Sequence, residues 1–247
     1  MALSRFSIAG AVVGLVALAG CAAPADWRSA SREPVGLAPD PTLTPGALVQ
    51  VYSARTWGWR GTFGVHTWIA VKPTGAPRYT VYEVIGWRLR WSGSALVVSG
   101  RAPDARWFGN APEVVAQLSG DGVDALIARI DRAARAYPYA RQYAVWPGPN
   151  SNTFTAFVAR AVPELQVDLP PTAIGKDYLG DRLVAPTPGG GYQFSVGGVF
   201  GVMASRVEGL EVNLLGLTFG IDPFSPALKL PFVGRIGPDR ANKTLSN

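Results

Sequence analysis

The sequence predicts an α+β fold, in which an antiparallel sheet with a few helices is followed by a glycine-rich β extension. Polar and apolar residues alternate in several short runs between residues 46 and 99, which is the period of a strand. Residues 121–137 and 152–161 instead have the apolar spacing of amphipathic helices. The 29 glycines and 21 prolines, together with glycine-apolar alternation over residues 191–238, favour short strands joined by turns.

Composition excludes several kinds of site. The chain has 247 residues, of which 48% are hydrophobic and 16% charged, as expected for one folded domain with an extension. It has one cysteine and one histidine, which excludes an intramolecular disulfide, a cysteine metal site and a multi-histidine metal site. These counts leave a carboxylate-rich cation site open, but no spacing in the sequence indicates one, and we expect no cofactor and no metal.

The N-terminal residues are typical of an export signal. Arg5 precedes an apolar run over residues 8–18, and the run ends in Leu-Ala-Gly-Cys at Cys21. This pattern resembles a bacterial lipobox, which implies cleavage before Cys21 and its modification with lipid such as palmitate. An uncleaved membrane anchor is the alternative reading. Ala22 favours the periplasmic face of the outer membrane over the inner membrane.

The predicted organisation is a signal peptide (1–20), a proline-rich tether (21–45), a main domain (46–185) and a β extension (186–247). Removing the segment with Arg5 lowers the formal charge from +6 to +5. For an exported chain we expect the membrane, anionic lipid or an acidic cell-wall polymer as partners, and no nucleic acid. Ordinary solubility would also explain the charge, and the sequence does not define an oligomeric state.

The main domain begins with predicted strands at residues 46–53, 65–71 and 79–85, of which the last two form a hairpin. Residues 86–91 continue the alternation, with Trp87, Leu89 and Trp91 on one face and Arg88 and Arg90 on the other. The two arginines are candidate contacts for an anionic ligand, or simply solvated side chains. A short strand at 94–99 and an irregular loop at 102–111 follow.

The clearest helix covers residues 121–137, with Asp121 or Asp124 as its cap and Pro138 at its end. Residues 139–145 suggest a short strand. A second helix is expected from about Asn152 to Ala161, before Pro163. Residues 164–190 are predicted to be loop, and the remainder to be strands of the extension.

Ser151 is the candidate nucleophile, because it follows a Pro-Gly-Pro turn at the start of the second helix. Unpaired amides and the dipole at a helix N-terminus can stabilise an oxyanion. A serine also needs a base, and His66 is the only histidine. Separately, Asn150 or Ser151 can simply cap the helix, and His66 can be a packed strand residue.

The segments Asn-Ser-Asn-Thr-Phe at 150–154 and His-Thr-Trp-Ile at 66–69 resemble those of permuted papain-like proteins, such as lecithin–retinol acyltransferase. The same segments look typical of an uncharacterised bacterial envelope domain family. The papain-like resemblance covers roughly residues 46–162 and implies a circularly permuted fold. It also implies that Ser151 replaces the usual cysteine, that His66 is the base, and that Glu83 or Tyr82 orients His66. The resemblance implies a cleft, for which Asn150, Asn152, Tyr82 and Trp68 are candidate lining or oxyanion residues.

Two functions follow as alternatives. The first is an envelope hydrolase or acyltransferase acting on amide or ester bonds, with Ser151, His66 and Glu83 as its catalytic set. The second is an inactive cleft that binds an envelope ligand or a protein. The absence of the nucleophilic cysteine motivates the second, since serine ionises far less readily than a thiol.

Overall fold

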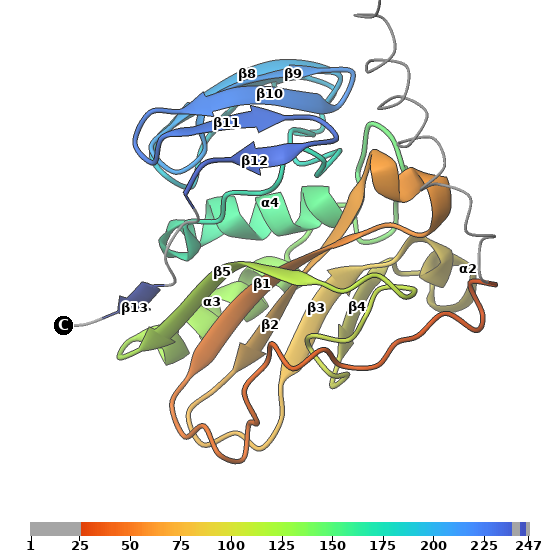
Figure 1. Cartoon of the computed structure of the whole chain (residues 1–247), viewed down its shortest axis with the longest axis vertical. Coiled ribbons are helices and arrows are strands. Elements are labelled where there is room, and N and C mark those ends of the chain that lie inside the picture. Colours follow the sequence, from red (N-terminus) through yellow and green to blue (C-terminus); the bar gives the residue numbers. More distant parts are fainter. Residues whose placement is uncertain (1–25, 239–242, 246–247) are drawn as a thin grey trace, which may run out of the picture. The chain divides into compact units, whose positions relative to one another are not determined.

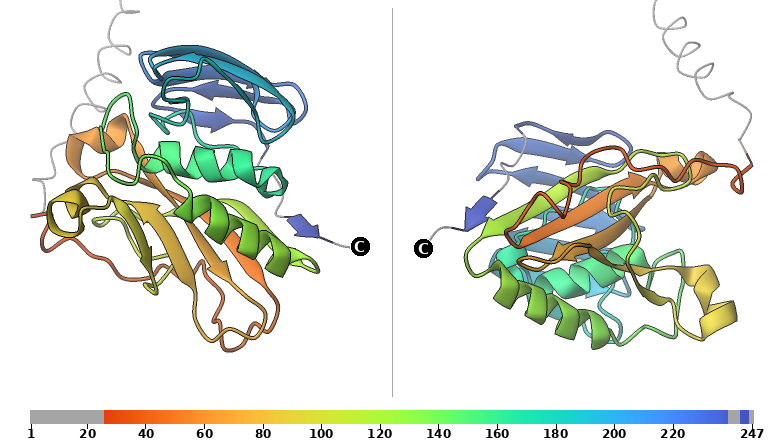
Figure 2. Two further views of the ribbon diagram at one scale, coloured as in Figure 1. Left: turned by 180° about the vertical axis from the view of Figure 1, so that it is seen from behind. Right: turned by 90° about the horizontal axis from the view of Figure 1, so that it is seen from below.

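The computed structural model describes residues 26–238 and 243–245. The chain divides into two units, residues 1–30 and 31–247, and all the elements named below belong to the second. Cys21 and the predicted signal peptide lie outside the described residues. The unit from residue 31 contains two sheets, and helix α4 lies between them in Figures 1 and 2.

The first sheet has six strands in the order β13-β5-β1-β2-β3-β4. They are β1 (Leu48–Arg55), β2 (Val65–Lys72), β3 (Thr80–Val84), β4 (Leu96–Ser99), β5 (Glu113–Gly120) and β13 (Lys243–Leu245). All neighbours pair antiparallel except β13, which pairs parallel to β5. The strands predicted at 46–53, 65–71, 79–85 and 94–99 are thus present, whereas β5 had no counterpart in the sequence analysis.

One face of this sheet packs against helices α3 (Val123–Arg135) and α4 (Ser151–Ala161), which confirms both predicted helices (Figure 2). The apolar stripe of α3, including Ile127 and Ile130, is buried in the same core as Val51 and Ile69 of the strands. Side chains alternate across a strand, so residues of the opposite parity, such as Tyr52 and Trp68, form a second core on the other face.

The second core is covered by the segment from residue 31 onward, much of which had been expected to be a tether. Asp104 accepts hydrogen bonds from the amides of Leu37 and Ala38, at 2.7 and 3.3 Å. The Tyr79 hydroxyl donates to the Pro39 carbonyl at 2.9 Å. Residues 31–45 are therefore part of the folded unit, because these contacts hold them against the sheet.

The C-terminal residues form a separate seven-stranded antiparallel sheet in the order β12-β11-β10-β9-β8-β7-β6. Its strands are β6 (Val184–Pro186), β7 (Gly191–Val196), β8 (Phe200–Ser205), β9 (Gly209–Leu214), β10 (Leu217–Asp222), β11 (Ala227–Leu230) and β12 (Gly234–Ile236). The predicted class, a mixed fold with a strand-rich C-terminal region, is confirmed. The circular permutation of a papain-like fold stays a prediction.

Three local predictions are wrong. Residues 86–92 form the short helices η2 (Gly86–Arg88) and α2 (Leu89–Ser92), not a strand; α2 ends at Gly93, whose φ of 67° is left-handed. Helix α3 begins after Gly122, not after a capping aspartate, and the Asp124 carboxylate instead accepts hydrogen bonds from Thr74. Residues 139–145 contain no strand; 139–141 form a turn and 142–144 are irregular. The remaining short helices are η1 (Gly58–Thr62) and η3 (Pro163–Leu165).

Candidate functional site

The N-terminus of α4 is closed by its own cap. Asn150 Oδ1 accepts hydrogen bonds from the amides of Asn152 and Thr153, and the Thr153 hydroxyl completes a capping box with the Asn150 amide. The Asn150 side-chain amide also donates to the carbonyls of Val145 and Ile174. Two of the amides that an oxyanion would need are therefore already used, as in an ordinary helix cap.

Ser151 lies at the first position of α4 and is buried. Its carbonyl oxygen accepts a hydrogen bond from the Thr67 hydroxyl of β2 at 3.3 Å. The Thr67 hydroxyl also lies 3.1 Å from Asn152 Oδ1. The side-chain amide of Asn152 donates to the carbonyls of Val65 and Ile174. Thr67 and Asn152 thus join the start of α4 to β2.

His66 belongs to a different arrangement. Its Nε2 lies 3.1 Å from Glu83 Oε2, and Arg101 donates to both Glu83 oxygens, at 2.8 and 3.2 Å. Glu83 is 2% exposed. Burial alone would raise the pKa of Glu83, but the hydrogen bonds from His66 and Arg101 outweigh it and lower the pKa to about 2. Burial lowers the pKa of His66, although the neighbouring Glu83 acts to raise it. The lowered pKa favours a neutral imidazole.

Aromatic rings cover this buried group. The Trp107 ring stacks on the imidazole with centroids 3.6 Å apart, and Trp87 stacks on Trp107 at 5.9 Å. The Arg101 guanidinium lies 4.8 Å from the centroid of the Trp68 ring. Arg101 and Trp107 come from the stretch after β4, for which an irregular loop was expected. No sequence motif marks them, because they meet His66 only through the tertiary fold.

The structure does not bring the expected nucleophile and base together. Thr67 contacts α4, and neighbouring side chains of a strand point to opposite faces, so His66 lies on the face away from α4. The histidine is joined to Glu83 instead, which settles the orientation of β3. Glu83 faces His66, while the Tyr82 hydroxyl donates to Asp131 of α3. Trp68, on the same face as His66, is fully buried and donates to the Pro103 carbonyl.

Arg88 and Arg90 do not form a strip on a strand, because they lie in the helical segment 86–92. Both are exposed, as are the neighbouring Trp87 and Trp91. No contact in the structure assigns them a ligand.

A polar cleft of about 820 Å³ opens between the two sheets, on the side of the first sheet that faces α4. One wall comes from the end of β1, including Ser53 and Arg55, with Glu113 of β5. The opposite wall comes from residues 168–172 and from Lys229 and Arg235 of the second sheet. This volume is in the range of sites for small ligands.

Arg55 is the cation of this cleft without a carboxylate partner among residues 26–238; its guanidinium donates to the Gly61 carbonyl at 2.8 Å. Lys229 and Arg235 instead pair with carboxylates, including Asp168. The Ser53 hydroxyl is buried and has no hydrogen-bond partner among the described residues. The sequence analysis missed this cleft. The alternation of β1 puts Ser53 and Arg55 on one face, but nothing in the sequence places residues 168–172 and the second sheet opposite them.

Among the described residues, no cluster of three or more His, Cys, Asp or Glu side chains is arranged to hold a metal ion. Nor does the described part contain a helix long and apolar enough to cross a membrane.

The comparisons with known proteins bear on the first sheet and its helices. No curated protein and no solved structure matches the chain. A family described as "Protein of unknown function (DUF3750)" matches residues 46–178, which include β1 to β5, α3 and α4 but none of the second sheet. The match covers more than half of the chain, and the chain belongs to this DUF3750 family.

Proposed function

We propose that the chain is a lipid-anchored protein of the bacterial cell envelope that binds a small anionic ligand in the cleft between its two sheets. The lipobox-like sequence ending at Cys21 supports the anchor, and that segment lies outside the described residues. The cleft is the observation that carries the binding role, since its size suits a small ligand and Arg55 offers it a positive charge.

The geometry favours binding over acyl transfer. A serine nucleophile needs a base within hydrogen-bond reach, and the histidine lies on the opposite face of the sheet. The cap at Asn150 already occupies two amides that would otherwise face an oxyanion. Ser151 is thus the first residue of a structural helix, and His66 belongs to a buried ion-pair cluster.

The chemistry of the cleft limits the ligand. A carboxylate or phosphate group can pair with Arg55 in a charge-assisted, bidentate hydrogen bond. Ser53, Asn110 and Thr172 supply further polar side chains around it. An anionic small molecule of the envelope, or the end of an acidic cell-wall polymer, fits these walls.

Native mass spectrometry of the full chain, purified from the envelope, tests the proposal. We expect a bound anionic molecule on the wild type and on Ser151→Ala, and its loss in Arg55→Gln. Arg90→Gln is the matched control, because it removes an exposed arginine outside the cleft. Retention by Arg55→Gln, or absence from the wild type, would contradict the proposed site.

A fluorophosphonate probe tests the catalytic alternative directly. The wild type should remain unlabelled under conditions in which a serine hydrolase reacts fully. Labelling that disappears in Ser151→Ala would establish Ser151 as a nucleophile and overturn the assignment of the protein as a binding module.

A further inference from the structure

The second sheet has an inverted distribution of side chains. An antiparallel sheet that packs on a protein usually turns its apolar face inward and its polar face to water. Here the inward face carries buried polar residues such as Gln193, Glu211, Asn213 and Lys229. Lys229 and Lys176 pair with the two carboxylate oxygens of Glu211, at 2.7 and 2.6 Å. The ion pairs therefore lie beneath the sheet, and the apolar side chains point away.

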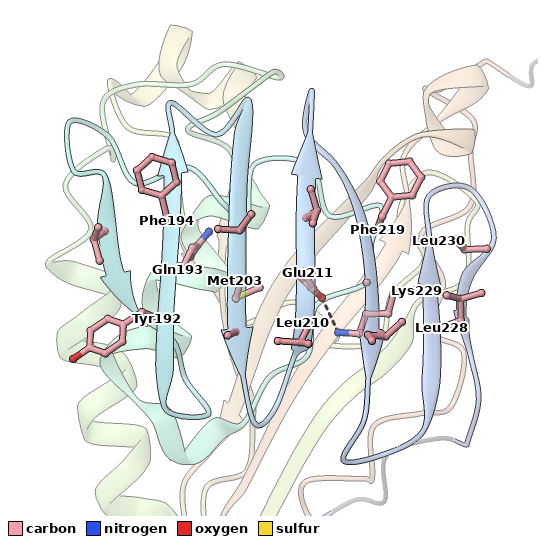
Figure 3. Close-up of a pocket in the computed structure, with 16 residues that line it drawn as sticks. Tyr192, Gln193, Phe194, Met203, Leu210, Glu211, Phe219, Leu228, Lys229 and Leu230 are labelled. Atoms are coloured by element: carbon pink, nitrogen blue, oxygen red, sulfur yellow. Dashed lines mark hydrogen bonds and ion pairs between the residues drawn. The ribbon is translucent and has the colours of Figure 1, made fainter.

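The outer face carries rows of apolar side chains, of which Figure 3 labels Tyr192, Phe194, Leu210, Phe219 and Leu228. Strand register places Phe194, Val202, Val212 and Phe219 side by side across β7 to β10. A second row crosses six strands, from Tyr192 through Ala204, Leu210, Ile221 and Leu228 to Ile236, and a third contains Val196, Phe200, Leu214 and Leu217. No charged side chain belongs to these three rows. Most of their members are one third to two thirds exposed.

We propose that this outer face is an interface with a second copy of the chain, in which two such sheets pack face to face as a β-sandwich. The apolar side chains of the three rows, at about half exposure each, together present on the order of 1,000 Å² of exposed apolar surface. That exceeds the few hundred Å² of apolar patch usual on a monomer and reaches the roughly 800 Å² per partner of a stable interface. An uncharged face is complementary to itself, as a two-fold dimer requires.

The edges of the sheet direct association to the face. Edge strand β6 has three residues and ends in Pro186, which cannot donate a backbone hydrogen bond; the other edge strand, β12, also has three residues. Short strands and proline are the usual protection of sheet edges against further pairing. The large apolar surface therefore lies where edge pairing is blocked and packing of sheet on sheet is open.

The same face is poorly suited to lipid headgroups. Surfaces that lie on a membrane combine apolar side chains with lysine or arginine, because the headgroup layer is polar and often anionic. The three rows contain neither residue, while Lys229 of β11 points inward to its carboxylates. A second apolar sheet would therefore cover this surface better than a layer of lipid headgroups.

Cysteine cross-linking of the full chain in cell membranes tests the interface. Val212 is in β9, the central strand, and is 41% exposed; Val98 of β4 in the first sheet is also 41% exposed and is the matched control. A bismaleimide with a spacer of about 10 Å suits the ~10 Å between packed sheets. We expect Val212→Cys to give a species of twice the mass of the monomer. Val98→Cys and the wild type, which retains Cys21, should give none.

A co-capture experiment, in which the interface variant should lose binding, complements the cross-linking. Two differently tagged full-length copies are expressed together, and one is captured in mild detergent. Val212→Asp in both copies should reduce co-capture at least tenfold, whereas Val98→Asp should leave it unchanged; resistance to trypsin confirms that each variant is folded. Equal co-capture by Val212→Asp and wild type, or no cross-linked dimer from Val212→Cys, would overturn the second-copy interface. These readouts do not depend on Arg55 or on a ligand in the cleft.

Discussion

Replacing Arg101 by alanine should destabilise the fold by about 3 kcal/mol. The guanidinium holds both oxygens of Glu83, at 2.8 and 3.2 Å, and Glu83 is 2% exposed. Removing one member of a buried ion pair costs about 3–5 kcal/mol, because the other charge stays buried. We expect the lower end of that range, since the Arg101 side chain is 26% exposed and His66 can still hydrogen-bond Glu83.

The stability that Glu83 contributes should depend on pH in a defined direction. The folded-state pKa of Glu83, about 2, lies below its ordinary value of 4.5, so its stabilisation is complete above pH 4.5 and is lost as the pH falls toward 2. Without Arg101 the folded-state pKa of Glu83 rises toward its unfolded value, so less stability is lost between pH 4.5 and pH 2. The difference in stability between the wild type and Arg101→Ala should therefore be largest above pH 4.5 and should shrink as the pH falls toward 2.

Urea unfolding at pH 7, followed by tryptophan fluorescence, measures the free energy of unfolding. A loss of 3 kcal/mol corresponds to a melting temperature roughly 6–12 °C lower for a domain of this size. Arg90→Ala, at an exposed site, should change the stability by less than about 0.5 kcal/mol. The double variant Glu83→Gln, Arg101→Met should be more stable than Arg101→Ala, because no charge is left buried. A loss below about 1 kcal/mol in Arg101→Ala would refute the reasoning.

Two further predictions concern single polar groups. Burial raises the pKa of Glu208 to about 7, so the wild type should lose about 3 kcal/mol of stability as the pH rises from 4.5 to 7. Glu208→Gln should remove this loss. Urea-unfolding stabilities of the wild type and Glu208→Gln that change in parallel from pH 5 to 8 would contradict the prediction. Asn150→Ala removes the cap of α4 and two further hydrogen bonds, and should cost about 2 kcal/mol in thermal or urea unfolding. Ser151→Ala, beside it, should cost less than Asn150→Ala, because the Ser151 hydroxyl takes no part in the cap; equal losses would show that the cap is not the source.

Local patterns predict much of the fold. The alternation over residues 65–71 and the helical spacing of Val123, Leu126 and Ile130 are both present in the structure. Residues 86–92 show the limit of that reasoning, because Trp87, Leu89 and Trp91 alternate like a strand but belong to two short helices. Gly86 lies so close to Tyr143 that a Cβ atom would be 2.4 Å from its ring. This contact, which involves a residue distant in sequence, competes with the local preference.

The candidate site depended still more on contacts between distant residues. The sequence named His66, Glu83 and Ser151 as a set, and the structure joins the first two and separates the third. A period of two establishes that His66 and Thr67 face opposite sides, but it does not establish which side meets α4. Arg101 and Trp107 carry no motif and could not be assigned to His66 in advance.

The sequence by itself determined the elements that local chemistry dictates. The period of most strands of the first sheet, the two amphipathic helices, a cap at Asn150 or Ser151, and the exclusion of cysteine and multi-histidine sites all follow from neighbouring residues and their counts. Only the tertiary structure decided which faces meet. Alternation in the C-terminal strands is equally compatible with either face inward, and the partners of Lys229 and Glu211 turn the charged face toward the protein. The apolar face was left outside because buried charges need opposite charges, and the carboxylates of Asp168 and Asp177 lie beneath the sheet.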